Sequence, residues 1–194
     1  MIMLQTLQHW DAAAFQFVNA SLSNPLFDAV LPFFREKWFW APLYLFLAVF
    51  VWLNSGNKKW AIILGMVLAA GLADLTSSRL VKQNVQRLRP CNDPAMVERV
   101  VLRVSCGSGY SFTSSHAANH FAVAVFIVGV FGYVRRWVRP VALGWATAIA
   151  FSQVYVGVHY PGDVLCGAAL GGLIGWAVMW LFVKRVRGGE KGAS

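Results

Sequence analysis

The stretch that decides the fold is residues 164–183, VLCGAALGGLIGWAVMWLFV, a run of twenty residues without a charged side chain. A helix needs about 20 apolar residues to cross the hydrocarbon core of a bilayer, so this run is predicted to span a membrane. Gly167, Gly171 and Gly175 recur in it at every fourth position, which lets a neighbouring helix approach closely. We expect that neighbour to belong to the same chain, and a dimer interface is the alternative.

Further apolar runs precede this one and are separated by polar connections. They cover residues 38–53, 60–80, 116–134 and 141–158. Residues 5–18 mix apolar and polar side chains at helical spacing, which is typical of a helix lying in the membrane interface. The sequence therefore predicts an all-α polytopic membrane helix bundle with five transmembrane helices. Six, with the N-terminal segment crossing the membrane, is the alternative.

Composition agrees with a single membrane domain. Of the 194 residues, 58% are hydrophobic and only 13% are charged, about half the usual charged share. The net charge of +9 could indicate a nucleic-acid partner, but no basic run is interleaved with stacking aromatics, so none is expected. We expect one domain over 1–194, made of an interfacial segment (1–37), a transmembrane core (38–183) and a cytoplasmic tail (184–194). No secretory signal peptide is visible in the sequence.

Lysine and arginine in the connections predict the orientation, because cytoplasmic loops are enriched in both. One side of the predicted bundle carries Lys58, Lys59, Arg135, Arg136, Arg139, Lys184, Arg185, Arg187 and Lys191. This side should be cytoplasmic, and the other should face the periplasm from a bacterial inner membrane. The periplasmic side would hold the end of the second span, the start of the third and the end of the fourth.

Polar segments occupy all of these periplasmic positions. They are residues 82–90, 112–116 and 152–163. In the first, Lys82 offers a point charge and Arg89 a bidentate guanidinium, a combination suited to phosphate. Snorkelling of both cations to the interface is the alternative.

The second polar segment places Ser114, Ser115 and His116 at the start of the third span. A helix N-terminus presents free backbone N–H groups to an anion, and serine hydroxyls add donors. A histidine in this first turn can donate a proton to a leaving oxygen. A plain helix cap is the alternative.

The third polar segment contains His159 and Asp163, four residues apart. If the carboxylate meets one ring nitrogen, the other nitrogen becomes a better-oriented nucleophile. Asp163 can also cap the last span. The three segments together carry the groups needed to hold and transfer a phosphoryl group.

The ordered set of segments resembles the type 2 phosphatidic acid phosphatase superfamily. The family's pattern is a lysine, six residues and Arg-Pro; then Pro-Ser-Gly-His; then Ser-Arg, five residues, a histidine, three residues and an aspartate. The resemblance covers residues 82–163. It implies that His159 is a nucleophile forming a phosphohistidine, that Asp163 orients it, and that His116 protonates the leaving group. It also implies that no metal or cofactor is needed, in line with the lack of a carboxylate cluster in the sequence.

The resemblance further implies a set of phosphate-binding residues. They are Lys82, Arg89, Ser114, Ser115 and, at the position of a family arginine, Gln153. Thr113 and Ser115 also replace the family's proline and glycine. Because Gln153 carries no charge, we expect another arginine to compensate for the lost stabilisation of the transition state. The candidates are Arg79, Arg87 and Arg103.

The sequence also predicts the surroundings of several further side chains. Asp74 lies in the second span, where an unpaired carboxylate is costly, and Arg79 is its expected partner. His120 and Asn119 follow His116 by about one turn and are expected mainly outside the site. Cys91 and Cys106 lie in the same periplasmic connection, where an oxidising compartment would permit a disulfide closing a loop over the site. Free thiols are the alternative.

The functional hypothesis is hydrolysis of a lipid phosphate or diphosphate whose tail stays in the bilayer. Undecaprenyl diphosphate is the preferred substrate, and phosphatidylglycerol phosphate, phosphatidic acid and the lipid A 1-phosphate also fit. A lipid phosphotransferase and a catalytically weak lipid-phosphate binding protein are the alternatives. The expected partners are the lipid and the membrane, and the sequence does not decide the oligomeric state.

Overall fold

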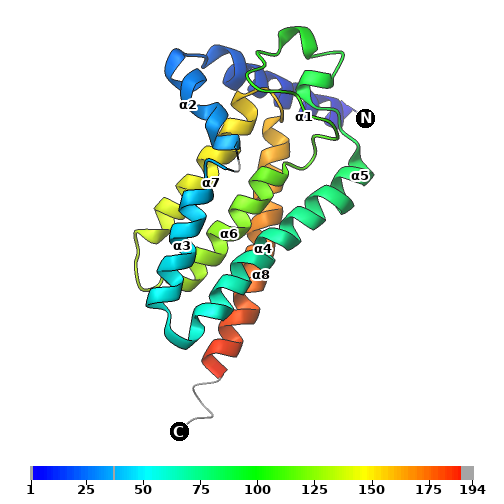
Figure 1. The fold of residues 1–194 in the computed structure, drawn as a ribbon. Coiled ribbons are helices and arrows are strands. Elements are labelled where there is room, and N and C mark those ends of the chain that lie inside the picture. Colours follow the sequence, from blue (N-terminus) through cyan, green and yellow to red (C-terminus); the bar gives the residue numbers. More distant parts are fainter. Residues whose placement is uncertain (1, 37, 189–194) are drawn as a thin grey trace.

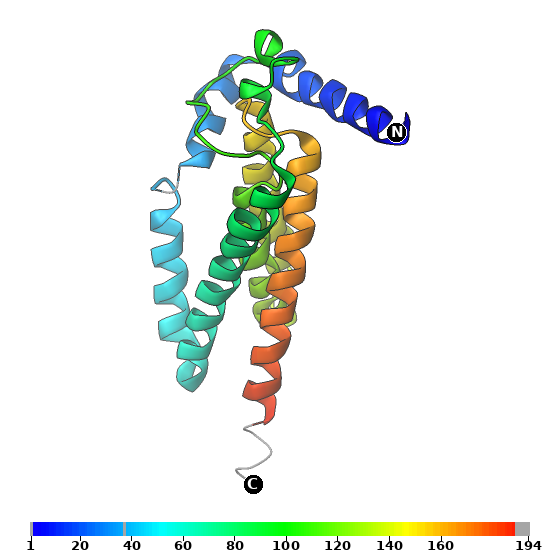
Figure 2. The ribbon, with the colours of Figure 1, turned by 90° about the vertical axis from the view of Figure 1, so that its right-hand side faces the viewer.

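The computed structural model describes residues 2–36 and 38–188, and the regular elements in this part of the chain are all helical (Figure 1). Long helices form a bundle and lie side by side in both views (Figures 1 and 2). They are α3 (Ala41–Asn54), α4 (Lys59–Leu75), α6 (Ser115–Phe131), α7 (Val138–Tyr155) and α8 (Pro161–Gly188). The predicted all-α helix bundle is confirmed, and these helices match the five expected spans.

The second span is longer than α4 alone. A π-helical turn, η3 (Thr76–Val81), and a short helix, α5 (Lys82–Val85), continue it to the end of the bundle. Gln86, with φ 51°, then adopts the left-handed conformation that ends many helices. By length and composition, the stretches Gly56–Asn92 and Pro161–Phe182 are able to cross a membrane, whereas α3 and α6 are shorter apolar helices.

The N-terminal helices lie at the end of the bundle that carries the polar segments. They are α1 (Ile2–Gln16), the π-helical η1 (Phe17–Ser21) and α2 (Pro25–Arg35). Figures 1 and 2 show α1 lying across this end instead of running alongside the other helices. Asn24 caps α2 by accepting a hydrogen bond from Phe27 N at 2.9 Å. The arrangement corresponds to the favoured prediction of five spans, and the place of residues 1–37 in a membrane stays a prediction.

Helix α6 occupies the centre of the bundle and packs against α4, α7 and α8. A Cβ atom on Gly167 would lie 2.6 Å from the Ser114 carbonyl oxygen, closer than real Cβ atoms come. Gly171 and Gly175 meet the following turns of α6 in the same way. The glycine row thus lets the α6 and α8 backbones touch, and the prediction that it packs within the chain is confirmed.

The connection between α5 and α6 covers the same end of the molecule. It contains two 3₁₀ turns, η4 (Pro90–Asn92) and η5 (Val97–Arg99), and a disulfide joins Cys91 to Cys106. The C-terminal end of α5, the start of α6 and the end of α7 all reach this end (Figure 1). The connections predicted to be cytoplasmic lie at the opposite end. Residues 189–194 of the expected cytoplasmic tail fall outside the described part of the chain.

Candidate active site

His159 lies in the short loop between α7 and α8. Gly157, with φ +92°, turns the chain there, and the amides of Val158 and His159 donate to Gln153 O at 3.3 and 3.2 Å. The His159 side chain is only 2% exposed. Burial lowers the pKa of His159 to about 4, although the Asp163 carboxylate acts in the opposite direction. The imidazole is therefore neutral at physiological pH, which is the form that can act as a nucleophile.

Asp163 lies in the first turn of α8 and is fully buried. Its Oδ2 accepts a hydrogen bond from Tyr160 N at 2.9 Å, which satisfies a free amide at the start of the helix. The same oxygen is 3.6 Å from His159 Nδ1, too far for a direct hydrogen bond. Asp163 thus caps α8 and faces the imidazole, as the sequence indicated, but it does not bond the ring directly.

Ser111 links the two groups and was missed in the sequence analysis. Its hydroxyl donates a short hydrogen bond to Asp163 Oδ2 and lies 3.3 Å from His159 Nδ1. The side chain is completely buried. A serine in a connection rich in glycine and serine has no distinctive sequence pattern, and only the folded chain brings it between the two residues.

Arg87 holds the other oxygen of the carboxylate. Its Nη1 lies 2.8 Å from Asp163 Oδ1, and its Nη2 lies 2.7 Å from Asp11 Oδ2. The guanidinium also stacks over the Tyr160 ring, 3.9 Å from the centroid. Asp11, on α1, further accepts from Gly162 N at 2.7 Å. Two carboxylates therefore neutralise Arg87, which positions Asp163 and ties α1 to the start of α8.

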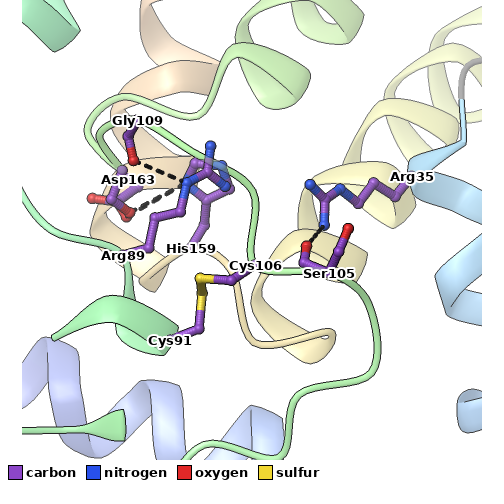
Figure 3. The surroundings of a disulfide bond; sticks show 9 residues. Arg35, Arg89, Cys91, Ser105, Cys106, Gly109, His159 and Asp163 are labelled. Carbon is purple, nitrogen blue, oxygen red and sulfur yellow. Dashed lines mark hydrogen bonds and ion pairs between the residues drawn. A yellow bond between two sulfur atoms is a disulfide. The ribbon is translucent and has the colours of Figure 1, made fainter.

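Lys82 and Arg89 present positive charge to the nucleophile. Lys82 Nζ donates to Tyr110 O at 3.1 Å, and Arg89 Nε donates to Gly109 O at 3.3 Å (Figure 3). Neither takes part in an ion pair with another described residue. Both charges act on His159 and on Asp163. The two predicted phosphate-binding cations thus act electrostatically on the predicted nucleophile.

The start of α6 supplies His116 to the same site, since its ring is close enough to interact electrostatically with His159. The neighbouring hydroxyls are used differently. Ser114 Oγ caps α6 by accepting from Ala117 N at 3.4 Å. Ser115 Oγ lies 3.0 Å from the Ser77 hydroxyl, at the end of the second span. Ser114 thus caps α6 and Ser115 bonds a neighbouring helix, and their binding of phosphate stays a prediction.

The histidine one turn further along α6 lies directly beside His116. His120 Nδ1 is 2.7 Å from His116 O, and the two rings are stacked with their centroids 6.4 Å apart. The other face of His120 meets Trp145 on α7, at 5.1 Å between centroids. His120 therefore borders the site behind His116.

Residues 58–187 match the PAP2 superfamily, the type 2 phosphatidic acid phosphatases. The chain belongs to this superfamily. The family resemblance found in the sequence is thereby confirmed.

Relatives within PAP2 include named lipid phosphatases. The chain is 32% identical over 188 residues to a lipid A 4'-phosphatase of Bacteroides thetaiotaomicron, covering 94% of this chain and 81% of that protein. It is 26% identical over 164 residues to a lipid A 4'-phosphatase of Porphyromonas gingivalis, with 84% and 69% covered. The fold resembles that of a transmembrane PAP2 phosphatidylglycerolphosphate phosphatase from Bacillus subtilis, with a TM-score of 0.67, 23% identity and coverage of 97% and 88%.

Gln153 stands where the PAP2 pattern has an arginine, and the structure uses its side chain inside α7. Its Nε2 donates to Ile149 O at 3.4 Å and to Ser152 Oγ at 3.1 Å. The side chain is completely buried, and no described residue bonds its Oε1. The hydrogen bonds that Gln153 was expected to donate to phosphate are thus made within its own helix.

Two of the arginines expected to compensate for Gln153 form ion pairs with aspartates. Arg87 is neutralised, as described above. Arg103 pairs with Asp28 and donates to the carbonyl oxygens of Asn19 and Tyr155 at 2.9 and 2.8 Å. It therefore holds η1 and α2 against the end of α7.

Asp74 was expected to have a structural partner such as Arg79; it has structural partners, but Arg79 is not one of them. Asp74 Oδ1 accepts instead from Asn119 Nδ2 at 3.2 Å and from the Ser78 hydroxyl at 3.4 Å. Neutral donors on α6 and on its own helix thus satisfy the carboxylate. Arg79 is exposed and belongs to no ion pair among the described residues.

Proposed function

We propose that this PAP2 protein is a lipid phosphatase that hydrolyses a phosphate ester of a membrane lipid through a phosphohistidine at His159. The observation that carries the proposal is a buried, neutral imidazole that faces an aspartate–serine pair and is acted on by two cations without an ion pair among the described residues. Nδ1 of His159 faces Ser111 and Asp163, so Nε2 is the nitrogen left free to attack.

The proposed reaction has two steps. In the first, Nε2 of His159 attacks phosphorus, the bond between phosphorus and the lipid oxygen breaks, and His116 donates a proton to the departing oxygen. In the second, His116 accepts a proton from water as that water attacks phosphorus, which releases phosphate and restores His159. Lys82 and Arg89 stabilise the charge on the equatorial oxygens, because phosphoryl transfer depends mainly on positioned positive charge.

The first substrate to test is a phosphomonoester on a lipid A-type headgroup. This choice rests on the Bacteroides lipid A 4'-phosphatase, which aligns with 94% of the chain. It replaces undecaprenyl diphosphate, the preferred substrate from the sequence, as our first choice. The site lies at one end of the bundle, where a headgroup could enter while the acyl chains stay in the bilayer. The distribution of lysine and arginine supports a periplasmic orientation of this end.

Phosphate release by the protein purified in detergent tests the proposal. The panel contains lipid A 4'-phosphate, lipid A 1-phosphate, undecaprenyl diphosphate, phosphatidylglycerol phosphate and phosphatidic acid. We expect the highest kcat/KM for a lipid A phosphomonoester and no turnover by His159→Ala. His9→Ala is the matched control, since His9 is exposed on α1. Substantial activity in His159→Ala would refute the nucleophile, and transfer of labelled phosphate to a second lipid would identify a phosphotransferase.

A further inference from the structure

A single loop binds three cations through its carbonyl oxygens. Lys82 Nζ lies 3.1 Å from Tyr110 O, Arg89 Nε lies 3.3 Å from Gly109 O, and Arg35 Nη1 lies 3.2 Å from Ser105 O. Lys82 and Arg89 belong to the PAP2 pattern. Arg35 comes from the last turn of α2, well outside the polar segments that define the family.

The Arg35 side chain is directed toward this loop. Figure 3 shows its side chain extending from α2 to Ser105, next to the disulfide-bonded Cys106. A Cβ atom on Gly107 would lie 3.7 Å from Arg35 Nη2, so the guanidinium rests against the loop backbone. The charge of Arg35 also acts on Arg89 and on His116. Arg35 therefore lies close to both a predicted phosphate-binding cation and the predicted acid.

The three cations differ from Arg87 and Arg103, the other partly buried cations of this region. Arg87 and Arg103 are paired with aspartates at the distances of ion pairs. Within the described residues, Arg35, Lys82 and Arg89 belong to no such pair. Glu36 acts on Arg35 only at longer range.

Like charges that are partly removed from water repel one another strongly, and carbonyl dipoles offset only part of this repulsion. An anion bound among the three cations would offset the repulsion that the carbonyl dipoles leave. The cluster is thus complementary to a group with several negative oxygens, and a phosphoryl group next to His159 is such an anion.

The residue at position 153 explains why the phosphate site needs a third cation. The PAP2 arginine is replaced by Gln153, whose amide nitrogen is bonded within α7 and whose Oε1 has no partner among the described residues. Lys82 and Arg89 alone would leave one fewer positive charge around the transition state than the family pattern provides.

We propose that Arg35 binds the phosphoryl oxygens of the substrate and supplies the positive charge that is missing at Gln153. This inference rests on the proposed phosphatase function. Arg35 approaches the phosphoryl group from α2 and the 105–110 loop, on the side of His116, instead of from α7. A structural role, in which Arg35 only holds the loop to α2, is the competing explanation.

The test compares Arg35→Ala, Arg35→Lys and Arg99→Ala in phosphate release from the best lipid substrate. Arg99 is the matched control because it is an exposed arginine in the same connection. Loss of one donor to a developing anion typically lowers kcat by about 10²–10³-fold, and we expect a loss of this size in Arg35→Ala. Arg35→Lys should keep part of the activity, and Arg99→Ala should match the wild type.

A second pair of variants separates charge from loop support. Gln153→Arg alone should not raise kcat, because Arg35 already fills the role. In Arg35→Ala/Gln153→Arg, the new guanidinium should restore kcat at least tenfold over Arg35→Ala. A structural role predicts no rescue, because an arginine on α7 cannot hold the loop to α2. Absence of rescue in a double variant that keeps the Tm of Arg35→Ala would overturn the proposed compensation.

Orthovanadate binding, followed by tryptophan fluorescence, gives a readout that does not need turnover. Arg35→Ala should weaken vanadate binding at least tenfold at unchanged Tm, and Arg99→Ala should leave it unchanged. Equal vanadate affinity in Arg35→Ala and the wild type would overturn the inference, even if activity fell. If the wild type released no phosphate from any lipid, the proposed function would fail, and vanadate binding would still decide the role of Arg35.

Discussion

Ser111→Ala is the sharpest test of how the nucleophile is positioned. The substitution removes the hydroxyl that lies 3.3 Å from His159 Nδ1 and donates to Asp163 Oδ2. It leaves the carboxylate bonded to Tyr160 N at 2.9 Å and to Arg87 at 2.8 Å. Asp163 should therefore stay in place, while His159 loses its link to the carboxylate.

The size of the effect follows from the environment of this hydroxyl. All three side chains are buried, so water cannot replace the lost bond. A hydrogen bond to a charged group contributes about 1.5–3 kcal/mol, and about 1.4 kcal/mol corresponds to a factor of ten. We therefore expect kcat/KM to fall by about 10- to 100-fold in Ser111→Ala, less than the complete loss expected for His159→Ala.

Steady-state phosphate release and thermal unfolding in detergent would measure this effect. Ser108→Ala is the control, because Ser108 is an exposed serine in the same connection. A fall in kcat/KM at similar Tm would support a positioning role. Wild-type kcat/KM in Ser111→Ala would refute the bridge, and a loss that only follows a lower Tm would show that Ser111 supports the fold instead.

Further predictions concern the acid, the pH profile, the disulfide and the helix contact. His116→Ala should lose less activity on substrates with good leaving groups, which need little protonation; equal losses for all leaving groups would argue against this acid. Because burial lowers the pKa of His159 to about 4, kcat/KM on the acid side should fall as the pH drops through that value and the ring is protonated. A fall near 6.5, the ordinary histidine pKa, would contradict the buried neutral ring. The two bridged cysteines should react with a thiol reagent only after reduction, and labelling without reductant would exclude the bridge. Gly171→Ala should destabilise the protein by about 1–3 kcal/mol through overpacking, whereas Gly144→Ala, with open space around it, should not; equal Tm values would refute the close contact.

The helix bundle and the central reacting groups were predictable because each has a local sequence pattern. A run of twenty uncharged residues such as 164–183 is expected to form a membrane helix, because few other structures can accommodate it. His159 and Asp163 are only four residues apart, and a turn of backbone brings them together. The glycine row in α8 likewise predicted a close helix contact, since the spacing of small residues is a local property.

The supporting groups were not predictable because they come from distant parts of the chain. Asp11 is more than 150 residues from Gly162, yet it accepts a hydrogen bond from that amide. Arg35 and Ser111 lie outside the three polar segments that predicted the site. No periodicity or spacing links these residues to His159, and only the tertiary packing of α1, α2 and the 86–114 connection brings them together.

The position of the missing arginine also has a physical explanation. Residue 153 is completely buried in α7, and a guanidinium there would lose its hydration unless an anion or several acceptors replaced it. Without substrate, such a charge destabilises the protein. Arg35 is only partly buried, and the Ser105 carbonyl satisfies one of its donors. Without substrate, a cation on α2 therefore destabilises the protein less than a cation on α7 inside the bundle. Arg35 can remain next to His116 in the free enzyme and become fully paired when a phosphorylated lipid binds.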